Sequence, residues 1–521
     1  MSASYESFPS RTEEDAQPAD AGYAPTSSRG VVGTHSAQQE LERPMVDKEP
    51  QGVSSGTPPS VRYRDLPFAL LFITQLVAVA AVAISNGKRV AGGLPAAGMV
   101  SVDTLRIFAV ACCASALFSV GWLALLRSHA RSLIWVSAGS SMVLYALTAL
   151  WLLTGKHASS TALGLGLLLA ACTQAFYLYC VRERVAFSAV LLSSVASLIQ
   201  AHPAMLTVAL LALVACVVWT VVWAVAVSFT LHARTFPVST REDAPGGTLE
   251  ATGYGAQGGV IFFLLVSFYW TAHVLKNVVH VAVAGTVGSW YFLAPQANVD
   301  PTKRALRRAL TTSFGSICLG SLVVSVIRAL RLGASAASRR TAPGVIRSCL
   351  LCALGFLDVL VRFFNQYAFT HVALYGKHFT SASRDTWALL VRCGIDVLVQ
   401  KDMIGSVLMM GCLVGGLTNT LLLGAWGRAV FDGDVHEWLP VAWIVFLIGA
   451  GAQLLVSSVV ESAVSALYVC YAEDPNALAS VNPELYACFV NAHHAAAPMT
   501  PAEERDERAI EDPMYGASTR Y

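Results

Sequence analysis

The sequence has few charged residues for its length. Asp, Glu, Lys and Arg make up 13% of its 521 residues, whereas a typical soluble domain has about 25%. A soluble protein of this size needs charged side chains to cover its surface, so their scarcity argues against a soluble enzyme or binding module. The net charge of +2 also argues against a nucleic-acid partner, because the basic density that such a partner requires is missing.

Several chemical motifs are absent as well. There is no N-x-Ser/Thr sequon, no Walker A sequence and no cluster of Asp, Glu and His at one membrane depth. Most of the twelve cysteines lie inside apolar runs, where they act as small packing residues. The pair Cys349-x-x-Cys352 has metal-like spacing, but no second pair accompanies it. We therefore expect no metal, no cofactor and no catalytic residues, and a protein that is not an enzyme.

Long apolar segments, by contrast, fill most of the chain. Hydrophobic residues make up 55% of the sequence, and a helix needs about 20 residues to cross the hydrocarbon core. We expect an all-α polytopic membrane protein whose transmembrane domain, residues 62–471, holds ten transmembrane helices. Residues 345–376 are apolar too, but charged side chains interrupt them and they are left out of this count. The predicted crossings are 66–84, 105–126, 133–154, 161–181, 185–200, 205–229, 258–293, 309–330, 403–426 and 438–471.

Polar tails flank the predicted membrane domain. Residues 1–61 are acidic, rich in Ser, Gln, Gly and Pro, and without a helical apolar period. Such a segment cannot bury enough surface to offset its ordering entropy, so we expect a disordered cytoplasmic tail. It also lacks the basic start and short apolar core of a signal peptide. Residues 472–521 form a second polar tail, which we also place in the cytoplasm.

The distribution of basic residues favours a cytoplasmic N-terminus. Cytoplasmic loops carry an excess of Lys and Arg, and this orientation puts most bases, including those of 328–347, on the inside. The segment PTKRALRR, residues 301–308, is an exception, because one crossing by 258–293 places it outside. A double crossing would move it inside but would move the next basic loop out. We therefore keep the single crossing, the even count and two cytoplasmic ends.

Residues 384–401 have the pattern of an amphipathic helix rather than a crossing. Apolar and charged side chains fall on opposite faces of a helix in this segment. We expect it to lie in the cytoplasmic interface of the membrane, and the alternative is a helix buried against the bundle. The apolar face consists of Trp387, Leu390, Val391, Ile395 and Leu398, and the charged face of Asp385, Arg392 and Asp396.

A polar stripe with aromatic neighbours lies in the predicted crossing 258–293. Such a stripe can line a cavity in which aromatic rings hold a compact organic cation through cation–π attraction. Alternatively, the aromatic residues mark the two membrane interfaces and the polar residues link helices. The stripe consists of Tyr269, His273, Asn277 and His280, with Lys276 beside it and Trp270, Trp290 and Tyr291 toward its ends.

Two other segments place charges inside apolar helices, where a charge usually has a partner or lines a pathway. Asp358 and Arg362 stand four residues apart, acid first, which is the favoured order for a helical ion pair. We expect a structural pair there rather than a substrate site. Glu461 shares a helical face with Ser458 and Ser465. It can serve as a counter-ion or a proton site, or it can pair with a buried base or reach the cytoplasmic boundary.

Four segments occur in an order known from one family. They are SFYWTAHVLKNVVHVAVAGTVGSWYF, SFGSICLGSLV, FNQYAFTHVALYGKHFTSASRDTWALL and YAEDPNALASVNPELY. Over residues 62–490 the chain resembles the choline transporter-like family, in its fungal pH-nine-sensitive branch. The resemblance implies ten crossings, cytoplasmic ends and a plasma-membrane carrier of choline or a related amine. Animal members have a large outer loop after the first crossing, whereas 85–104 is short here, so the fold carries over more readily than the substrate.

We therefore predict a plasma-membrane carrier or facilitator of choline or another small organic cation. Its partners are then the lipid bilayer and that cation. The alternative is a non-transporting membrane scaffold or lipid-organising protein. The candidate substrate-binding residues are Tyr269, Trp270, His273, Asn277, His280, Trp290 and Glu461.

Overall fold

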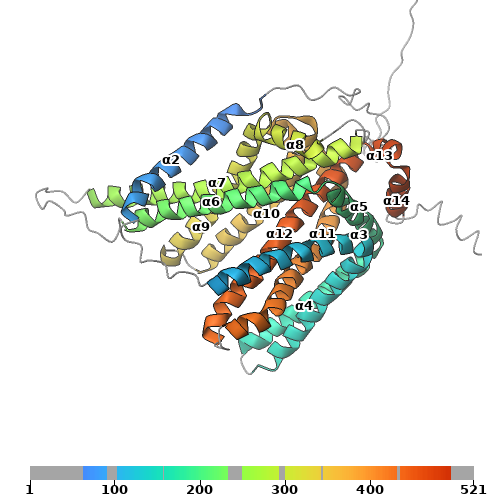
Figure 1. The fold of residues 1–521 in the computed structure, drawn as a ribbon, viewed down its shortest axis with the longest axis horizontal. Coiled ribbons are helices and arrows are strands. Elements are labelled where there is room, and N and C mark those ends of the chain that lie inside the picture. Colours follow the sequence, from blue (N-terminus) through green and yellow to red (C-terminus); the bar gives the residue numbers. More distant parts are fainter. Residues whose placement is uncertain are drawn as a thin grey trace, which may run out of the picture. The chain divides into compact units, whose positions relative to one another are not determined.

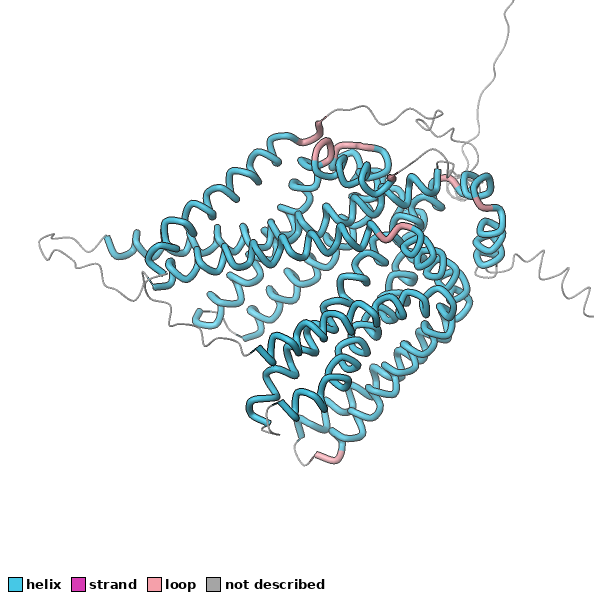
Figure 2. Tube along the Cα trace, viewed as in Figure 1, coloured by secondary structure: helices cyan, strands magenta, loops and turns pink. Residues whose placement is uncertain are grey.

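The computed structural model describes seven stretches of the chain: 63–90, 102–155, 158–232, 249–292, 300–341, 344–430 and 435–494. The chain divides into two units, Met1–Pro58 and Pro59–Tyr521, and every described residue belongs to the second. Figure 2 shows that the described residues form helices joined by short turns. The expected all-α fold is confirmed.

Nine helical segments among the described residues are long and apolar enough to cross a membrane. The chain is therefore a polytopic membrane protein, as predicted, and the count of ten crossings stays a prediction. Figure 1 shows how the helices follow one another. They are α2 (Leu66–Val90), α3 (Val102–Leu153), α4 (Ala158–Val181), η1 (Arg182–Arg184), α5 (Val185–Ala201), α6 (Ala204–His232), α7 (Leu249–Phe292), α8 (Pro301–Leu310), α9 (Phe314–Thr341), α10 (Gly344–Tyr375), α11 (Phe379–Val430), α12 (Val435–Glu473), α13 (Pro475–Val481) and α14 (Pro483–His494).

Two of these helices depart from the sequence prediction. Ser348–Tyr375, the greater part of α10, is one of the candidate crossings, although its internal charges led us to leave residues 345–376 out. The crossing predicted over 309–330 begins at Phe314 instead, because a turn at residues 311–313 separates it from α8.

The start of α2 is fixed by a junction around Arg64. The backbone N–H of Arg64 donates to the carbonyl of Thr312, in the turn between α8 and α9, at 3.0 Å. Its Nε donates to the carbonyl of Gly376, in the turn between α10 and α11, at 3.2 Å. Gly376 has a φ of 61°, a backbone conformation that glycine adopts without steric cost. Arg64 thus joins two turns that are far apart in the sequence.

Asp65 completes this junction, which we name the Asp65 junction. Its carboxylate accepts a hydrogen bond from the Ser316 hydroxyl at 2.5 Å and one from the Phe379 backbone N–H at 3.2 Å. Those donors belong to the first turns of α9 and α11. A Cβ on Gly315 would lie 2.3 Å from the carbonyl oxygens of both Arg64 and Asp65. The backbone before α2 therefore approaches α9 at a distance that only glycine allows.

The Gly315 contact can be tested with one methyl group. We expect Gly315→Ala to destabilise the protein by about 1–3 kcal/mol or more, because overpacking against backbone atoms cannot be relieved by a rotamer change. The measurement is the unfolding midpoint temperature of the purified protein in detergent. Gly333→Ala, in the same helix, is the control, since a Cβ there meets nothing within 4 Å. Equal midpoint temperatures for the two variants would contradict the close approach of the backbone before α2 to Gly315.

The ends of α7 and α12 lie on the same side of the bundle as one another. The hydroxyl of Tyr291, at the end of α7, donates to the carbonyl of Asp474, just after α12, at 2.9 Å. The Asp474 carboxylate accepts from the backbone N–H groups of Asn476 and Ala477 at 3.1 and 3.2 Å, and Pro475 opens the first turn. This is the N-cap arrangement that starts a helix. The Asp-Pro step of YAEDP therefore ends α12 and begins α13.

α5 also lies on this side of the bundle. The ring of Phe187, near its start, is 5.3 Å from the ring of Phe489 in α14. Gln200, near its end, accepts from Arg127 at 3.1 Å, next to the bend of α3 at His129. Both ends of α5 thus meet elements on this side of the bundle, α14 and the bend of α3, which does not favour the predicted crossing over 185–200. A cavity of about 420 Å³ lies between α5, the bend of α3, the end of α7 and the start of α14. It is lined by Arg127, Ser193, Ser194, Ser197, Leu198, Ala201, Trp290, Asn482 and Leu485.

α8 lies between the Asp65 junction and the contacts at the ends of α7 and α12, so that all of them form one face of the bundle. The short helix packs along the end of α7, where the Thr286 hydroxyl donates to Thr302 at 3.3 Å, and it leads directly into the turn held by Arg64. Lys303 and Arg304 are exposed on its outer side. We call this side, which carries the start of α2, α5, α8, α13 and α14, the terminal face. The segment 301–308, predicted to lie opposite the termini, belongs to the terminal face.

The opposite helix ends form a second face, the far face. Because α9 starts and α10 ends on the terminal face, the end of α9 and the start of α10 lie at the far face. Arg331, in the second half of α9, therefore lies toward the far face, whereas we had expected it on the side of the termini. Two apolar clusters hold the far ends together: one is Val79, Ala83, Trp219, Ala226 and Leu264, and the other is Ile107, Ala111, Leu423, Trp438, Val441 and Val445.

The placement of α8 can be tested by labelling. We expect Lys303→Cys to react with a membrane-impermeant maleimide from the same side as an epitope tag placed at the C-terminus, because α8 and α14 share the terminal face. The measurement is labelling of sealed and of permeabilised cells, with the unmutated chain as background for native thiols. Labelling from the side opposite the tag would contradict this arrangement.

The predicted amphipathic helix is the first part of α11. Phe379–Val430 is one helix, and its candidate crossing is Lys401–Gly424. Before the crossing, Trp387 and Val391 are 66% and 69% exposed, whereas Leu389 is fully buried. Leu389 and Leu390 thus pack on the bundle, whereas Trp387 and Val391 of the predicted apolar face point away from it. Its place in the membrane interface stays a prediction.

Candidate functional site

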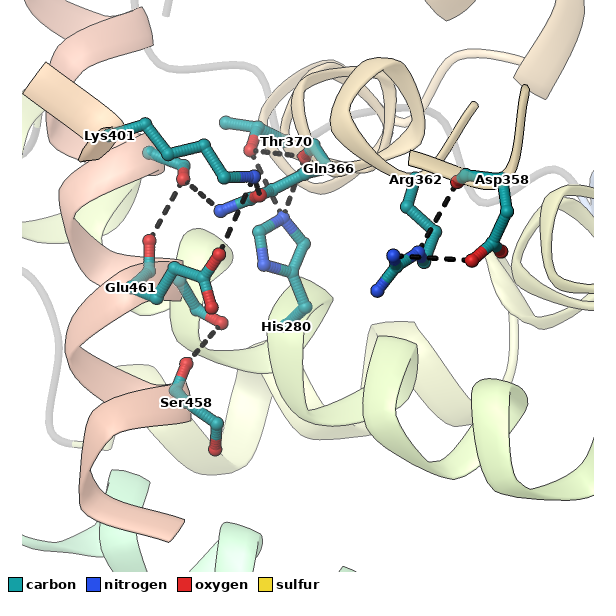
Figure 3. A network of polar contacts seen from close by, with 10 residues as sticks. His280, Asp358, Arg362, Gln366, Thr370, Lys401, Ser458 and Glu461 are labelled. Atoms are coloured by element: carbon teal, nitrogen blue, oxygen red, sulfur yellow. Dashed lines mark hydrogen bonds and ion pairs between the residues drawn. The ribbon is translucent and has the colours of Figure 1, made fainter. Parts of the chain in front are cut away.

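A polar network in the middle of the bundle centres on Gln366 of α10 (Figure 3). Its Oε1 accepts from Nζ of Lys401 in α11 at 2.6 Å, and its Nε2 donates to the hydroxyl of Ser465 in α12 at 2.5 Å. Its backbone carbonyl lies 2.8 Å from Nε2 of His280 in α7. Because a carbonyl only accepts, this His280 nitrogen carries the proton. Gln366 therefore connects all four helices.

The Lys401 ammonium also forms an ion pair with Glu461. Its Nζ is 3.5 Å from Oε1 of Glu461 and 5.1 Å from the ring centroid of Phe363. The ammonium thus lies within reach of both a carboxylate and an aromatic face. The side chains of Lys401 and Glu461 are 32% and 39% exposed, so the pair is open to the space beside it.

That space is a cavity of about 340 Å³ between α7, α10, α11 and α12, which we name the carrier cavity. Its volume is within the range of about 300–1,000 Å³ of small-molecule sites, and its lining is mostly apolar with a few polar groups, as such sites require. Its charged lining groups are two lysines and one glutamate. The lining residues are Lys276, Gln366, Tyr367, Lys401, Ile404, Gly405, Leu408, Met409, Cys412, Leu454, Ser457, Ser458, Glu461, Val464, Ser465 and Tyr468.

Asp358 and Arg362 form an ion pair in the part of α10 that precedes Gln366 (Figure 3). The two side chains are 3.2 Å apart, and Arg328 of α9 is 3.1 Å from the other oxygen of the same carboxylate. The Asp358 side chain is only 5% exposed, whereas the arginines are 29% and 41% exposed. One buried carboxylate therefore holds two guanidinium groups and joins α9 to α10.

The Asp358 cluster can be tested by neutralising its carboxylate. We expect Asp358→Asn to lower the free energy of unfolding by about 3–5 kcal/mol, because two guanidinium groups lose their counter-ion within the bundle. Asp385→Asn is the matched control, since Asp385 pairs with Lys377 at 2.7 Å with both side chains well exposed, and such pairs contribute about 0–1 kcal/mol. The measurement is unfolding of both purified variants. Similar losses would show that Asp358 is not a structural counter-ion.

Comparisons with known proteins agree with this architecture. Residues 165–476 match the model of the family described as Plasma-membrane choline transporter. The chain is 31% identical over 390 residues to a CTL-like protein of Dictyostelium discoideum, a match that covers 73% of this chain and 65% of that relative. It is 30% identical over 396 residues to Protein PNS1 of Gibberella zeae, with 74% and 72% covered. It is 29% identical over 461 residues to Protein PNS1 of Neurospora crassa, with 83% and 80% covered.

This chain belongs to the choline transporter-like family. The predicted resemblance, including its fungal PNS1 branch, is thereby confirmed. The family and the apolar helices support the coarser part of the predicted function, a multi-pass membrane transport protein in contact with the bilayer.

In this family member the predicted stripe on α7 does not form a single site. Trp270 donates through Nε1 to the carbonyl of Cys318 at 2.9 Å, and Asn277 donates to the Ser321 hydroxyl at 2.9 Å. Both side chains therefore link α7 to α9. This agrees with the alternative interpretation of the stripe, in which its polar residues link helices.

The other predicted residues are divided among three places. Glu461 lines the carrier cavity, and His280 contacts its wall through Gln366. Tyr269 lines a separate cavity beside Asp358, and Trp290 lines the cavity next to α5.

Sequence reasoning missed Gln366 and Lys401 as site residues. Gln366 lies in the family segment FNQYAFTH, where only its polarity inside an apolar run marks it. Lys401 was assigned to the end of the amphipathic helix, so its approach to α12 was not foreseen. The available signal was the possibility that Glu461 pairs with a buried base, and Lys401 is that base.

Proposed function

We propose that this chain is a plasma-membrane carrier or facilitator of choline or another small organic cation, which binds in the carrier cavity beside Glu461. The observation that supports this most directly is the position of the Lys401 ammonium, 3.5 Å from the Glu461 carboxylate and 5.1 Å from the Phe363 ring. A carboxylate and an aromatic face are the groups that attract a quaternary ammonium, which has no N–H to donate. Lys401 thus occupies the place where a substrate cation would bind.

The charges of the cavity imply that Lys401 must leave before a cation enters. With Lys401 in place, Glu461 is neutralised and Lys276 adds a further positive charge to the lining. A second cation then meets repulsion rather than attraction. When Lys401 moves away from Glu461 it keeps the Gln366 side chain as an acceptor, so the displaced ammonium stays hydrogen-bonded. Substrate binding is in this way linked to a movement of the Lys401 side chain.

The topology that we propose has ten crossings and cytoplasmic ends. The candidate segment Arg106–Leu153 is 48 residues long and bends at His129, so it crosses twice. Ser159–Ala201 crosses once, because α5 stays on the terminal face, and each of the remaining candidates crosses once. The exposed bases Lys303 and Arg304 favour a cytoplasmic terminal face.

Uptake of radiolabelled choline in a transporter-deficient cell tests this function. We expect saturable uptake from the unmutated chain, and a KM raised about tenfold or more by Glu461→Gln, because a desolvated cation–carboxylate contact is lost. We expect Lys401→Met to lower KM, because the internal competitor for Glu461 is removed. Asp385→Asn, which breaks an exposed pair outside the cavity, is expected to leave KM unchanged.

Each variant is compared at equal surface abundance. An unchanged KM in Glu461→Gln would exclude the carrier cavity as the cation site. No uptake above background by the unmutated chain, for choline or for a panel of small amines in liposomes, would instead favour the non-transporting scaffold.

A further inference from the structure

A second cavity, of about 540 Å³, lies between α7, α9 and α10. None of its lining residues lines the carrier cavity. We name it the arginine pocket, because it brings three arginines together. Its polar lining consists of Tyr269, Arg328, Arg331, Ser335, Asp358 and Arg362.

The arginine pocket has more positive charge than its carboxylate can balance. Asp358 pairs with Arg328 and Arg362, and Arg331 has no ion-pair partner among the described residues. The sequence contains no acidic residue between Asp300 and Asp358, so neither α9 nor the connection to α10 can supply another counter-ion. The lining of the pocket therefore keeps an excess of positive charge.

Arg331 is exposed, and its guanidinium lies beside α10. Its guanidinium carbon is 3.4 Å from the position that a Cβ on Gly355 would occupy. Gly355 stands one helical turn before Asp358, so the two positions lie on the same side of α10. The absence of a side chain at Gly355 leaves room for the guanidinium, and Arg331 and Asp358 line the same cavity.

We propose that the arginine pocket binds an oxyanion, a phosphate or carboxylate group, with Arg331 as its principal ligand. A guanidinium presents parallel N–H donors that match the oxygens of such groups. Arg328 and Arg362 each have donors left after pairing with Asp358, because a guanidinium carries five N–H groups. The Tyr269 hydroxyl adds a neutral donor at the α7 wall. The oxyanion is either a free ion or the phosphate of a lipid headgroup.

The first experiment titrates inorganic phosphate into the purified full chain in detergent, at constant ionic strength maintained with chloride. We expect a saturable rise in the unfolding midpoint temperature. Arg331→Gln is expected to raise the apparent Kd about tenfold or more, since a charge-assisted bidentate contact is lost. Arg304→Gln, which removes an exposed charge on α8, is the control and is expected to bind as the unmutated chain does.

The second experiment distinguishes a lipid from a free ion. The protein is reconstituted in nanodiscs of phosphatidylcholine with and without phosphatidylglycerol, and lipids that stay bound are measured by native mass spectrometry. Phosphatidylglycerol retained by the unmutated chain and lost from Arg331→Gln, with no effect of phosphate, would assign the pocket to a lipid headgroup. Saturable phosphate binding without such retention would assign it to a free oxyanion.

The proposal fails if neither probe binds, or if Arg331→Gln binds both as the unmutated chain does. Should Arg331→Gln not yield folded protein, Arg331→Lys keeps the charge but loses the planar fork, and we expect it to weaken phosphate binding as well. Unaltered binding by Arg331→Lys in that case would also overturn the assignment to Arg331. Because choline uptake is not measured here, these outcomes do not depend on the proposed carrier function.

Discussion

The low dielectric of the bilayer makes an unpaired charge inside the bundle costly, and in this protein two acidic side chains pair with bases of neighbouring helices. A charge facing lipid alone costs several kcal/mol. Lys401 of α11 meets Glu461 of α12, and Asp358 of α10 meets Arg328 of α9. If one helix of either pair shifted by one residue along its neighbour, the paired charges would be separated. Ion pairing therefore sets the registers of α11 against α12 and of α9 against α10.

The same requirement extends to polar backbone groups where helices end. The turns before α9 and after α10 leave carbonyl groups without helical partners, and Arg64 supplies donors to both Thr312 and Gly376. Gly315 lets the backbone come close enough for Asp65 to reach the first turns of α9 and α11. The helices that carry the central ion pairs are thus also tied together at the terminal face.

Local hydropathy predicted the fold class and most crossings, and it failed where the deciding contact was not local. α10 was left out because Asp358 and Arg362 were read as interruptions, whereas their cost is offset by an arginine of another helix, which no window on α10 contains. α5 was counted because an apolar run looks the same whether it faces lipid or the protein interior. In the site, Glu461 was predicted but its partner Lys401 was not, since the two residues are sixty positions apart in the sequence and only the fold brings them together.

The two cavities are both lined by residues of α7. Tyr269 lines the arginine pocket and Lys276 lines the carrier cavity, while His273 lies between them, with charges of both groups acting on it. Its Nε2 is buried and without a hydrogen-bond partner among the described residues. An oxyanion in the arginine pocket would offset positive charge that otherwise opposes a cation at Glu461. Thermodynamic linkage then requires the converse. A cation bound at Glu461 would raise the affinity of the arginine pocket for the oxyanion by the same factor as the oxyanion raises the affinity for the cation.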